Sequence, residues 1–165
     1  MISQAIHTLD LALWLAGPVA ELQALMHKTP MHQLEAEDWA GALLTFQSGA
    51  VGTLTASTAA FPGTAESITM HCTKGTAHLA SGTLTLTMHN GRHEKVGAPA
   101  PTGGGADPMA FTHDWHAAVI SNFADSLTHD RPPMTTGREA LRAHAVIDAM
   151  QTAQTTGHRT KVSTP

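Results

Sequence analysis

The chain has 165 residues, of which 42% are hydrophobic and only 13% are charged, so it carries enough apolar material for one buried core. The chain has 9 Lys and Arg residues and 13 Asp and Glu residues, which gives a formal net charge of -4. It contains no run of basic residues, and this argues against nucleic-acid binding. No stretch approaches the roughly 20 apolar residues of a membrane span, and a lone cysteine, Cys72, forms no intrachain disulfide. We therefore expect a cytoplasmic protein.

The first 27 residues predict a helix that leads into a strand. Ile2, Ile6, Leu9 and Leu13 recur at helical spacing, so residues 2–16 are typical of a largely buried helix that ends at Gly17-Pro18. From Val19 onward apolar and polar residues alternate, which predicts a strand with one wet face.

The middle of the chain predicts an antiparallel meander. Residues 39–46 and 51–58 flank a tight turn and are typical of a hairpin. Four further strands are expected at 66–72, 76–80, 83–89 and 92–96. Ser81-Gly82 and Asn90-Gly91 fall between strands, and the second pair is a candidate type I′ turn.

Two helices are expected after a Gly- and Pro-rich connection at 97–108. The first has an apolar seam that should pack on an apolar surface, formed by Phe111, Trp115, Val119, Phe123 and Leu127. The last begins at a capping box of Thr136 and Glu139 and runs to Gly157. Its predicted inner face is Leu141, Ala145, Ala149 and Met150.

The order of these elements predicts an α+β fold, a mostly antiparallel sheet with helices packed on one face. The other sheet face is polar but uncharged, so it is available for dimerisation. The residues that predict this face are Thr53, Thr55, Ser57, Thr83, Thr85 and Thr87.

Three polar side chains share one side of the first predicted helix. Ser3, His7 and Asp10 are spaced i, i+4 and i+7. A histidine side chain can gain or lose a proton near neutral pH, and Asp10 is near enough to His7 to orient it, so the pair suits proton transfer. The alternative is a buried histidine satisfied by the backbone and by Asp10, with Ser3 as the helix N-cap.

Five short motifs occur in an order that resembles the C-terminal domain of the Gfo/Idh/MocA oxidoreductases. The first is the helix segment from His7 to Leu11. The others are Glu37-Asp38 before an apolar strand, 46–52, 72–76, and Arg131-Pro132-Pro133 ahead of 137–140. Together they cover nearly the whole chain.

The resemblance implies half of a two-domain enzyme. In this family a Rossmann domain binds NAD or NADP, and the C-terminal domain closes over a sugar, an inositol or a related polyol. His7 would handle the proton that accompanies hydride transfer, together with a lysine of the Rossmann half. Ser3 stands where many members have an aspartate, and it would contact a substrate hydroxyl.

We therefore expect residues 1–165 to be one N-terminally truncated C-terminal domain without its Rossmann domain, inactive alone and self-associating. Gly103-Gly104-Gly105 lacks the Rossmann glycine spacing and is interpreted as linker. The possible partners are a second copy and a separately encoded Rossmann domain.

Two other classes of function stay open. One is a non-catalytic β-sheet dimer that binds a small ligand or another protein. The second is a metal binder, for which the candidate ligands are His113 and His116 on one helix and the strand histidines His71, His78, His89 and His93. We interpret these histidines as surface residues, so no metal site is predicted.

Overall fold

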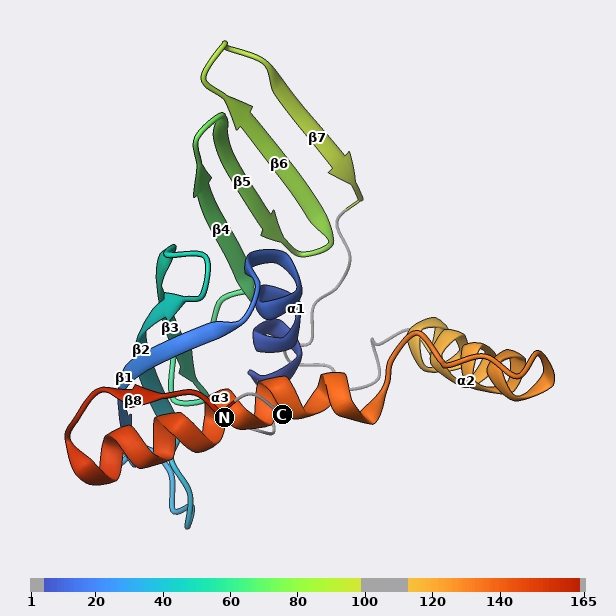
Figure 1. Cartoon of the computed structure of the whole chain (residues 1–165). Helices are drawn as coiled ribbons and strands as arrows, with labels where there is room; N and C mark the ends of the chain where they lie inside the picture. The colour runs from blue at the N-terminus through green and yellow to red at the C-terminus, as the bar shows by residue number, and fades with distance from the viewer. Residues whose placement is uncertain (1–4, 99–112, 164–165) are drawn as a thin grey trace. The chain divides into compact units, whose positions relative to one another are not determined.

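The structure is a computed structural model that describes residues 5–98 and 113–163 (Figure 1). The chain divides into two compact units. The first comprises Met1–Ala60 and His116–Pro165, and the second comprises Phe61–Trp115. Within the described ranges no helix is both long and apolar enough to cross a membrane.

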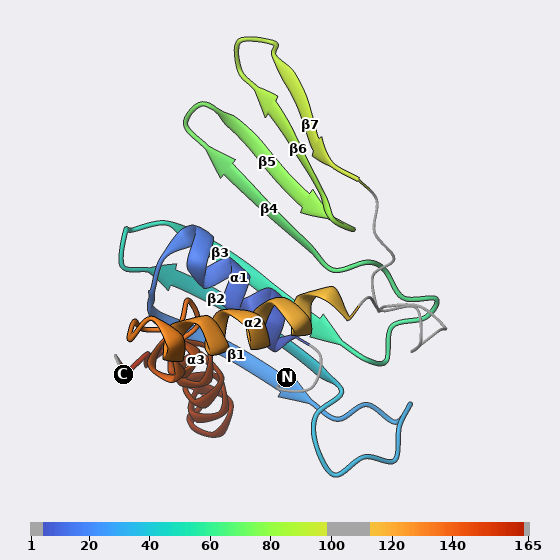
Figure 2. The same cartoon turned by 90° about the vertical axis from the view of Figure 1, so that its right-hand side faces the viewer.

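The first unit is an antiparallel sheet covered on one face by two helices (Figures 1 and 2). The strand order is β3-β2-β1-β8. The strands are β1 (Val19–His27), β2 (Trp39–Phe46), β3 (Val51–Ser57) and the short β8 (Thr160–Lys161), and the covering helices are α1 (Ile6–Ala16) and α3 (Gly137–Thr156). Apolar residues of both helices and of β1 and β2 form one core.

Alternation along β1 and β2 separates the two faces of this sheet. Leu22 and Met26 point into the core, whereas Leu25 on the opposite face is 57% exposed. On β2 the buried set is Ala40, Ala42, Leu44 and Phe46. The predicted strand with one wet face is therefore confirmed.

The edge of β1 beyond β8 is capped by α3. β8 pairs with β1 only at Glu21 and Leu22. Further along, the Met26 backbone N–H donates to Oε1 of Gln154 at 2.9 Å. A helix side chain thus takes the place of the missing strand, as a buried backbone donor requires.

The ends of the helices follow their capping residues. α3 begins after Thr136, whose side chain accepts from the Glu139 N–H, while Glu139 reaches back to the Thr136 N–H, so the predicted capping box is confirmed. The predicted inner face is wrong at Leu141, which is 49% exposed. The buried face is instead Ala143, Val146, Ile147, Ala149, Met150 and Ala153, because the stripe facing the sheet follows the i, i+3, i+4 rows from Ala143.

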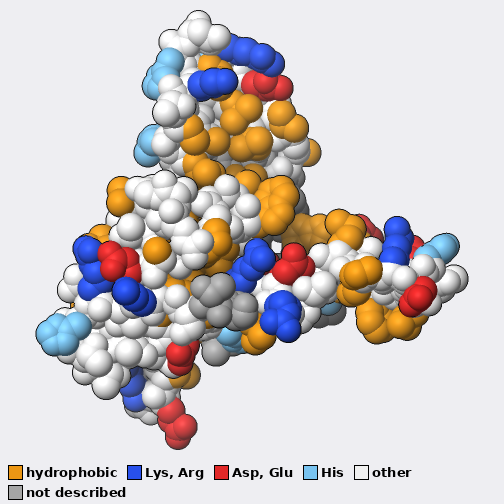
Figure 3. All heavy atoms as spheres, viewed as in Figure 1, with side chains coloured by type: hydrophobic (Ala, Val, Ile, Leu, Met, Phe, Trp, Pro, Cys, Tyr) orange, Lys and Arg blue, Asp and Glu red, His pale blue; other side chains and the backbone are white. Residues whose placement is uncertain are grey.

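The second unit is a four-stranded antiparallel sheet in the order β4-β5-β6-β7. Its strands are β4 (Ser67–Cys72), β5 (Gly75–Ala80), β6 (Thr83–Met88) and β7 (His93–Gly97). The register sets polar residues, mostly Thr and His, on one face, while the opposite face carries Ile68, Met70, Ala77, Leu79, Leu84, Leu86 and Val96. Figure 3 shows apolar side chains gathered over this sheet.

The hairpin turns of this sheet differ from the expectation at one point. Ser81 and Gly82 both have positive φ, 49° and 74°, which is the signature of a type I′ turn. Asn90 is not among the residues with positive φ, and only Gly91 is, at 84°. The type I′ prediction for Asn90-Gly91 is therefore wrong, because a type I′ turn needs positive φ at both positions.

The α+β class with antiparallel pairing is confirmed, although the strands form two sheets where the sequence suggested one. The ladder stops between β3 and β4, where Pro62 has no N–H to donate and Gly63 has a φ of 81°. The chain leaves the first sheet there and starts a second.

The helix α2 (Asp114–Thr128) carries the expected apolar seam, but in the described ranges nothing covers it. Trp115, Val119, Phe123 and Leu127 are all exposed. The prediction that this seam packs on an apolar surface is wrong for the residues described. Phe111 and most of the expected connection at 97–108 lie outside them.

Candidate functional site

The solvent-facing side of α1 carries the predicted catalytic pair. Leu9 and Leu13 anchor the helix in the core, so residues on the opposite side face outward. His7 and Asp10 are both exposed. Trp14 lies on the same side at the i+7 position from His7 and is 80% exposed.

His7 is thus a surface histidine, and the alternative of a buried, fully satisfied ring does not hold. Within the described ranges no hydrogen bond or ion pair joins His7 to Asp10. Their spacing of three residues still keeps both on one helix face. Ser3, the third predicted site residue, lies outside the described residues; the residue preceding α1 is Ala5, which makes no side-chain cap.

An open depression of about 740 Å³ lies beside the N-terminal end of α1. Ala5, the residue before α1, lines it, whereas the described His7 and Asp10 do not. The loop between β1 and β2, the end of β3 and α3 supply the rest: Gln33, Leu34, Glu35, Ala36, Glu37, Asp38, Trp39, Ala40, Ala56, Ser57, Thr58, Ile147 and Gln151. None of these lining residues is Lys or Arg, so the described walls favour a neutral ligand over an anion.

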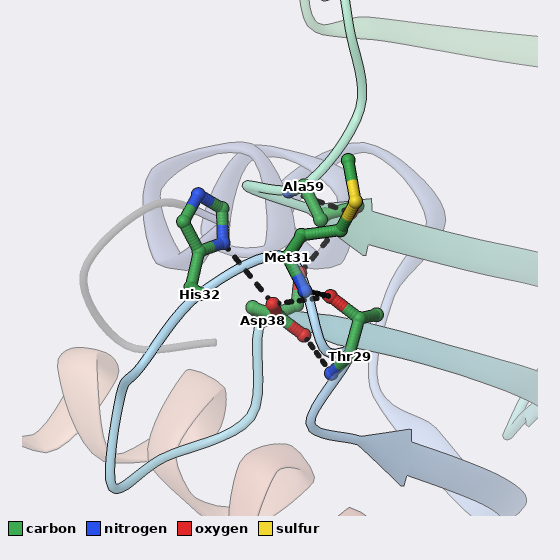
Figure 4. Close-up of polar contacts among 6 residues, drawn as sticks. Thr29, Met31, His32, Asp38 and Ala59 are labelled. Carbon is green, nitrogen blue, oxygen red and sulfur yellow. Dashed lines mark hydrogen bonds and ion pairs between the residues drawn. The ribbon is translucent and has the colours of Figure 1, made fainter.

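A buried carboxylate organises the loop that lines this depression (Figure 4). Asp38 Oδ1 accepts the Thr29 backbone N–H at 2.6 Å, and Oδ2 accepts the Thr29 hydroxyl at 2.6 Å. Oδ2 also lies 3.1 Å from Nδ1 of His32. The Asp38 side chain is 0% exposed, whereas that of His32 is 41% exposed.

These donors keep the Asp38 carboxylate ionised. The Thr29 hydroxyl and the Thr29 N–H, in that order, lower the pKa of Asp38 from 3.8 to about 2, and the His32 ring adds a smaller effect in the same direction. Burial acts against them by disfavouring the charge. The hydrogen bonds prevail, so the loop is tied down by a charge that persists through the physiological pH range.

Thr29 and His32 were not predicted from the sequence. Glu37-Asp38 was predicted to be a family motif before a strand. Thr29 and His32 lie in a polar loop without periodicity, so no pattern marks them. The available signal was weak: an aspartate at the foot of a strand, with hydroxyl and imidazole donors nine and six residues earlier.

The other histidines are dispersed. In the described part of the chain, no three His, Cys, Asp or Glu side chains are placed to share a metal ion. On the second sheet His78 and His71 instead form cross-strand hydrogen bonds with Thr69 and Thr76, at 2.8 and 3.1 Å. Nε2 of His113 lies 3.8 Å from Oδ1 of the adjacent Asp114.

The antiparallel sheets, with α1 and α3 packed on one face of the first, define an α+β domain. The chain belongs to the Gfo/Idh/MocA oxidoreductase family: the model of the "Oxidoreductase family, C-terminal alpha/beta domain" matches residues 1–163. The resemblance seen in the sequence motifs is therefore confirmed.

A curated relative and a solved structure support the same class. D-apiose dehydrogenase of Rhizobium rhizogenes is 30% identical over 151 residues, 87% of this chain and 43% of that protein. An oxidoreductase from Agrobacterium radiobacter, solved with NAD+, L-tartaric acid and magnesium, is 25% identical with a TM-score of 0.78, over 97% of this chain and 48% of that one.

The fold is also shared with a more distant enzyme. Levoglucosan dehydrogenase in complex with NADH and levoglucosan has a TM-score of 0.79 at 15% identity, over 97% of this chain and 49% of that one. The chain thus spans less than half of the length of each of these three proteins. It is an oxidoreductase C-terminal domain with sugar dehydrogenases among its relatives.

Proposed function

We propose that this chain is the substrate-binding and oligomerisation domain of an NAD(P)-dependent oxidoreductase that acts on a sugar, an inositol or a related polyol. One observation carries the proposal: His7 and Asp10 face solvent on α1 while the other side of the same helix is fixed in the core. A rigid helix presenting an unburied imidazole is what proton transfer to a bound substrate requires.

In this proposal His7 exchanges a proton with the reacting hydroxyl of the substrate. Asp10, one turn further along the same face, stabilises the protonated imidazole and restricts its orientation. Ser3, four residues before His7 in the sequence, would hydrogen-bond a neighbouring hydroxyl. Such a substrate would extend from His7 into the depression that Ala5 lines, since His7 and Asp10 are not themselves part of its lining.

The depression also supports the substrate class. Its polar lining consists of carboxylates, amides and hydroxyls, and these groups hydrogen-bond the hydroxyls of a neutral polyol. D-apiose and levoglucosan, named for two of the relatives, are compounds of this class.

The described residues do not fit a nicotinamide dinucleotide by themselves. Both sheets are wholly antiparallel, and the described ranges contain no βαβ unit with a glycine-rich turn opening a helix. We therefore assign the binding of NAD or NADP to a Rossmann domain outside the residues described. The chain alone is expected to be inactive.

The uncovered face of the first sheet supports the oligomerisation role. Leu25, Leu43 and Val51 are exposed there beside Thr53 and Thr55. This mixture of small polar and large apolar side chains, without a charge at its centre, suits burial against a second copy.

A combined thermal-shift and turnover assay tests the proposal. The chain is measured with NAD(H) and NADP(H), alone and mixed with the protein encoded immediately upstream, with D-apiose and levoglucosan as substrates. No cofactor binding and no turnover by the chain alone, together with turnover on mixing, would support a split oxidoreductase. Cofactor binding or turnover by the chain alone would overturn the assignment, and silence in both with a folded chain would favour a non-catalytic module.

A further inference from the structure

We propose that His32 is a substrate-positioning residue, an imidazole held in one tautomer by buried Asp38 so that its Nε2 accepts a hydrogen bond from a hydroxyl of a neutral polyol. The inference rests on the proposed function, because it adds a residue on the β1–β2 loop to the same substrate site.

The tautomer follows from the hydrogen bonds of Asp38. An ionised carboxylate only accepts, so the His32 nitrogen at 3.1 Å from Oδ2 must carry a proton. That nitrogen is Nδ1, and in the neutral ring the lone pair is therefore on Nε2. Figure 4 shows the second ring nitrogen directed away from Asp38.

The ring is anchored to the sheet through Asp38. The Asp38 backbone N–H donates to the His27 carbonyl at 3.2 Å, and the Asp38 carbonyl accepts from the Thr58 N–H at 2.9 Å and from the Ser57 hydroxyl at 3.1 Å. These bonds join the ends of β1 and β3 to the foot of β2. A loop imidazole so supported is pre-organised, which lowers the entropic cost of binding through it.

Asp38 and His32 differ from a wholly buried polar pair in the exposure of their side chains. The carboxylate is fully buried, but the imidazole is 41% exposed, so only its Nδ1 edge is committed. Thr29 already supplies two of the three donors.

His32 lies next to the candidate substrate site. It lines an open depression of about 500 Å³ together with Lys28, Thr29, Pro30, Gln33, Leu34 and Glu35. Gln33, Leu34 and Glu35 also line the larger depression that reaches Ala5 at the start of α1. The same loop therefore borders both hollows, with acceptor and donor groups suited to hydroxyls.

The consequence for recognition is selectivity for a hydroxyl at one position. A site built to hydrogen-bond a hydroxyl discriminates strongly against the analogue that lacks it, because the polar group on the protein is then left unpaired. Nε2 of His32, Gln33 and Glu35 together would fix the orientation of the polyol while His7 handles the proton.

Two substitutions separate positioning of the ligand from support of the loop. In His32→Asn the amide nitrogen replaces Nδ1 and keeps the donation to Asp38, but Nε2 is lost. In His32→Gln the amide reaches toward the position of Nε2, but the donor to Asp38 is lost. A purely structural role predicts that only His32→Gln is impaired.

The experiment is NMR of the full chain with D-apiose and levoglucosan as probes. Long-range ¹H–¹⁵N spectra should show His32 with its proton on Nδ1, and a probe should shift its ring resonances. His32→Asn should keep the thermal midpoint and bind the probe about tenfold more weakly, equivalent to about 1.4 kcal/mol. Binding by His32→Asn as tight as wild type, or a ring protonated on Nε2, would overturn the inference.

The His7 resonances separate this inference from the proposed function. A probe that shifts His7 and leaves His32 unchanged would overturn the inference alone. A probe that shifts His32 but not His7 would count against the assignment of His7. The absence of any shift at either ring would overturn the inference, whereas the proposed function is decided by turnover on mixing.

Discussion

The Thr29 backbone N–H lies 2.6 Å from Oδ1 of Asp38, nine residues further along the chain. This bond closes the loop between β1 and β2 on a carboxylate that is fully buried. The charge remains because the Thr29 hydroxyl and His32 donate to the same group. The loop that borders the candidate site is therefore held by an ionised carboxylate, so its stability depends on pH.

Asp38 should make the fold acid-labile in a defined window. Its pKa in the folded chain is about 2, against an ordinary value of 3.8, so its stabilising effect is complete above about pH 4 and is lost as the pH falls through about 2. Asp38→Asn should lower the free energy of unfolding at pH 7 and flatten its pH dependence between about pH 4 and 2. Urea unfolding at a series of pH values measures this; Asp148→Asn, an exposed carboxyl on α3, is the control, and unchanged pH dependence in Asp38→Asn would contradict the role.

Leu22 and Leu25 test the face assignment of β1. Leu22 is 1% exposed in the core and Leu25 is 57% exposed on the other face. Leu22→Ala should cost about 2–5 kcal/mol of unfolding free energy, because it removes buried apolar atoms and leaves a cavity. Leu25→Ala should cost less than about 0.5 kcal/mol in a monomer. Similar losses for both, by urea denaturation at a concentration where the chain is monomeric, would mean that the register is different.

The capping box of α3 can be measured by single substitutions. Thr136→Ala removes the acceptor for the Glu139 N–H and should cost about 1 kcal/mol. Thr136→Ser keeps that acceptor and should restore most of the stability. Thr135→Ala, one residue earlier and exposed, is the matched control. A loss in the control equal to that in Thr136→Ala would argue against a specific cap.

Substitutions of His7 and of Asp10 should lower the kcat of the reconstituted oxidoreductase to different extents. His7→Asn should lower kcat by about 10²–10⁴-fold, the usual contribution of a general acid or base. Asp10→Asn should have a smaller effect, because Asp10 acts through the ring of His7. Both residues are exposed, so neither change should alter the thermal midpoint of the chain. Wild-type turnover in His7→Asn would remove it from the proposed mechanism.

Leu43 tests self-association through the first sheet. It is 62% exposed in the middle of β2, on the face away from the helices. Leu43→Lys should shift sedimentation from dimer to monomer at micromolar concentration, because a charge at the centre of an apolar interface is left unpaired. Val96→Lys on the second sheet, also exposed, serves as the comparison. A wild-type chain that sediments as a monomer would contradict the dimer itself.

Local signals predicted most of the elements. The strand at 39–46 was predicted with the bounds that β2 has, and the capping box placed the start of α3, because both patterns depend on neighbours within four residues. The family motifs likewise placed His7 on a helix. Leu141 was misassigned because the buried stripe of α3 is set by the sheet it faces, which periodicity alone does not orient.

The amino-acid sequence by itself determined the α+β class, the antiparallel hairpins and the family, since alternation, turn residues and motif order are properties of short segments. Only the tertiary structure decided that His7 faces solvent, that the strands divide into two sheets, and that Asp38 joins Thr29 and His32. The reason is physical: burial and hydrogen bonding between distant residues depend on which surfaces meet. Asp38 lies within ten residues of Thr29 and His32, yet its role depends on the β1–β2 ladder that brings the ends of that loop together.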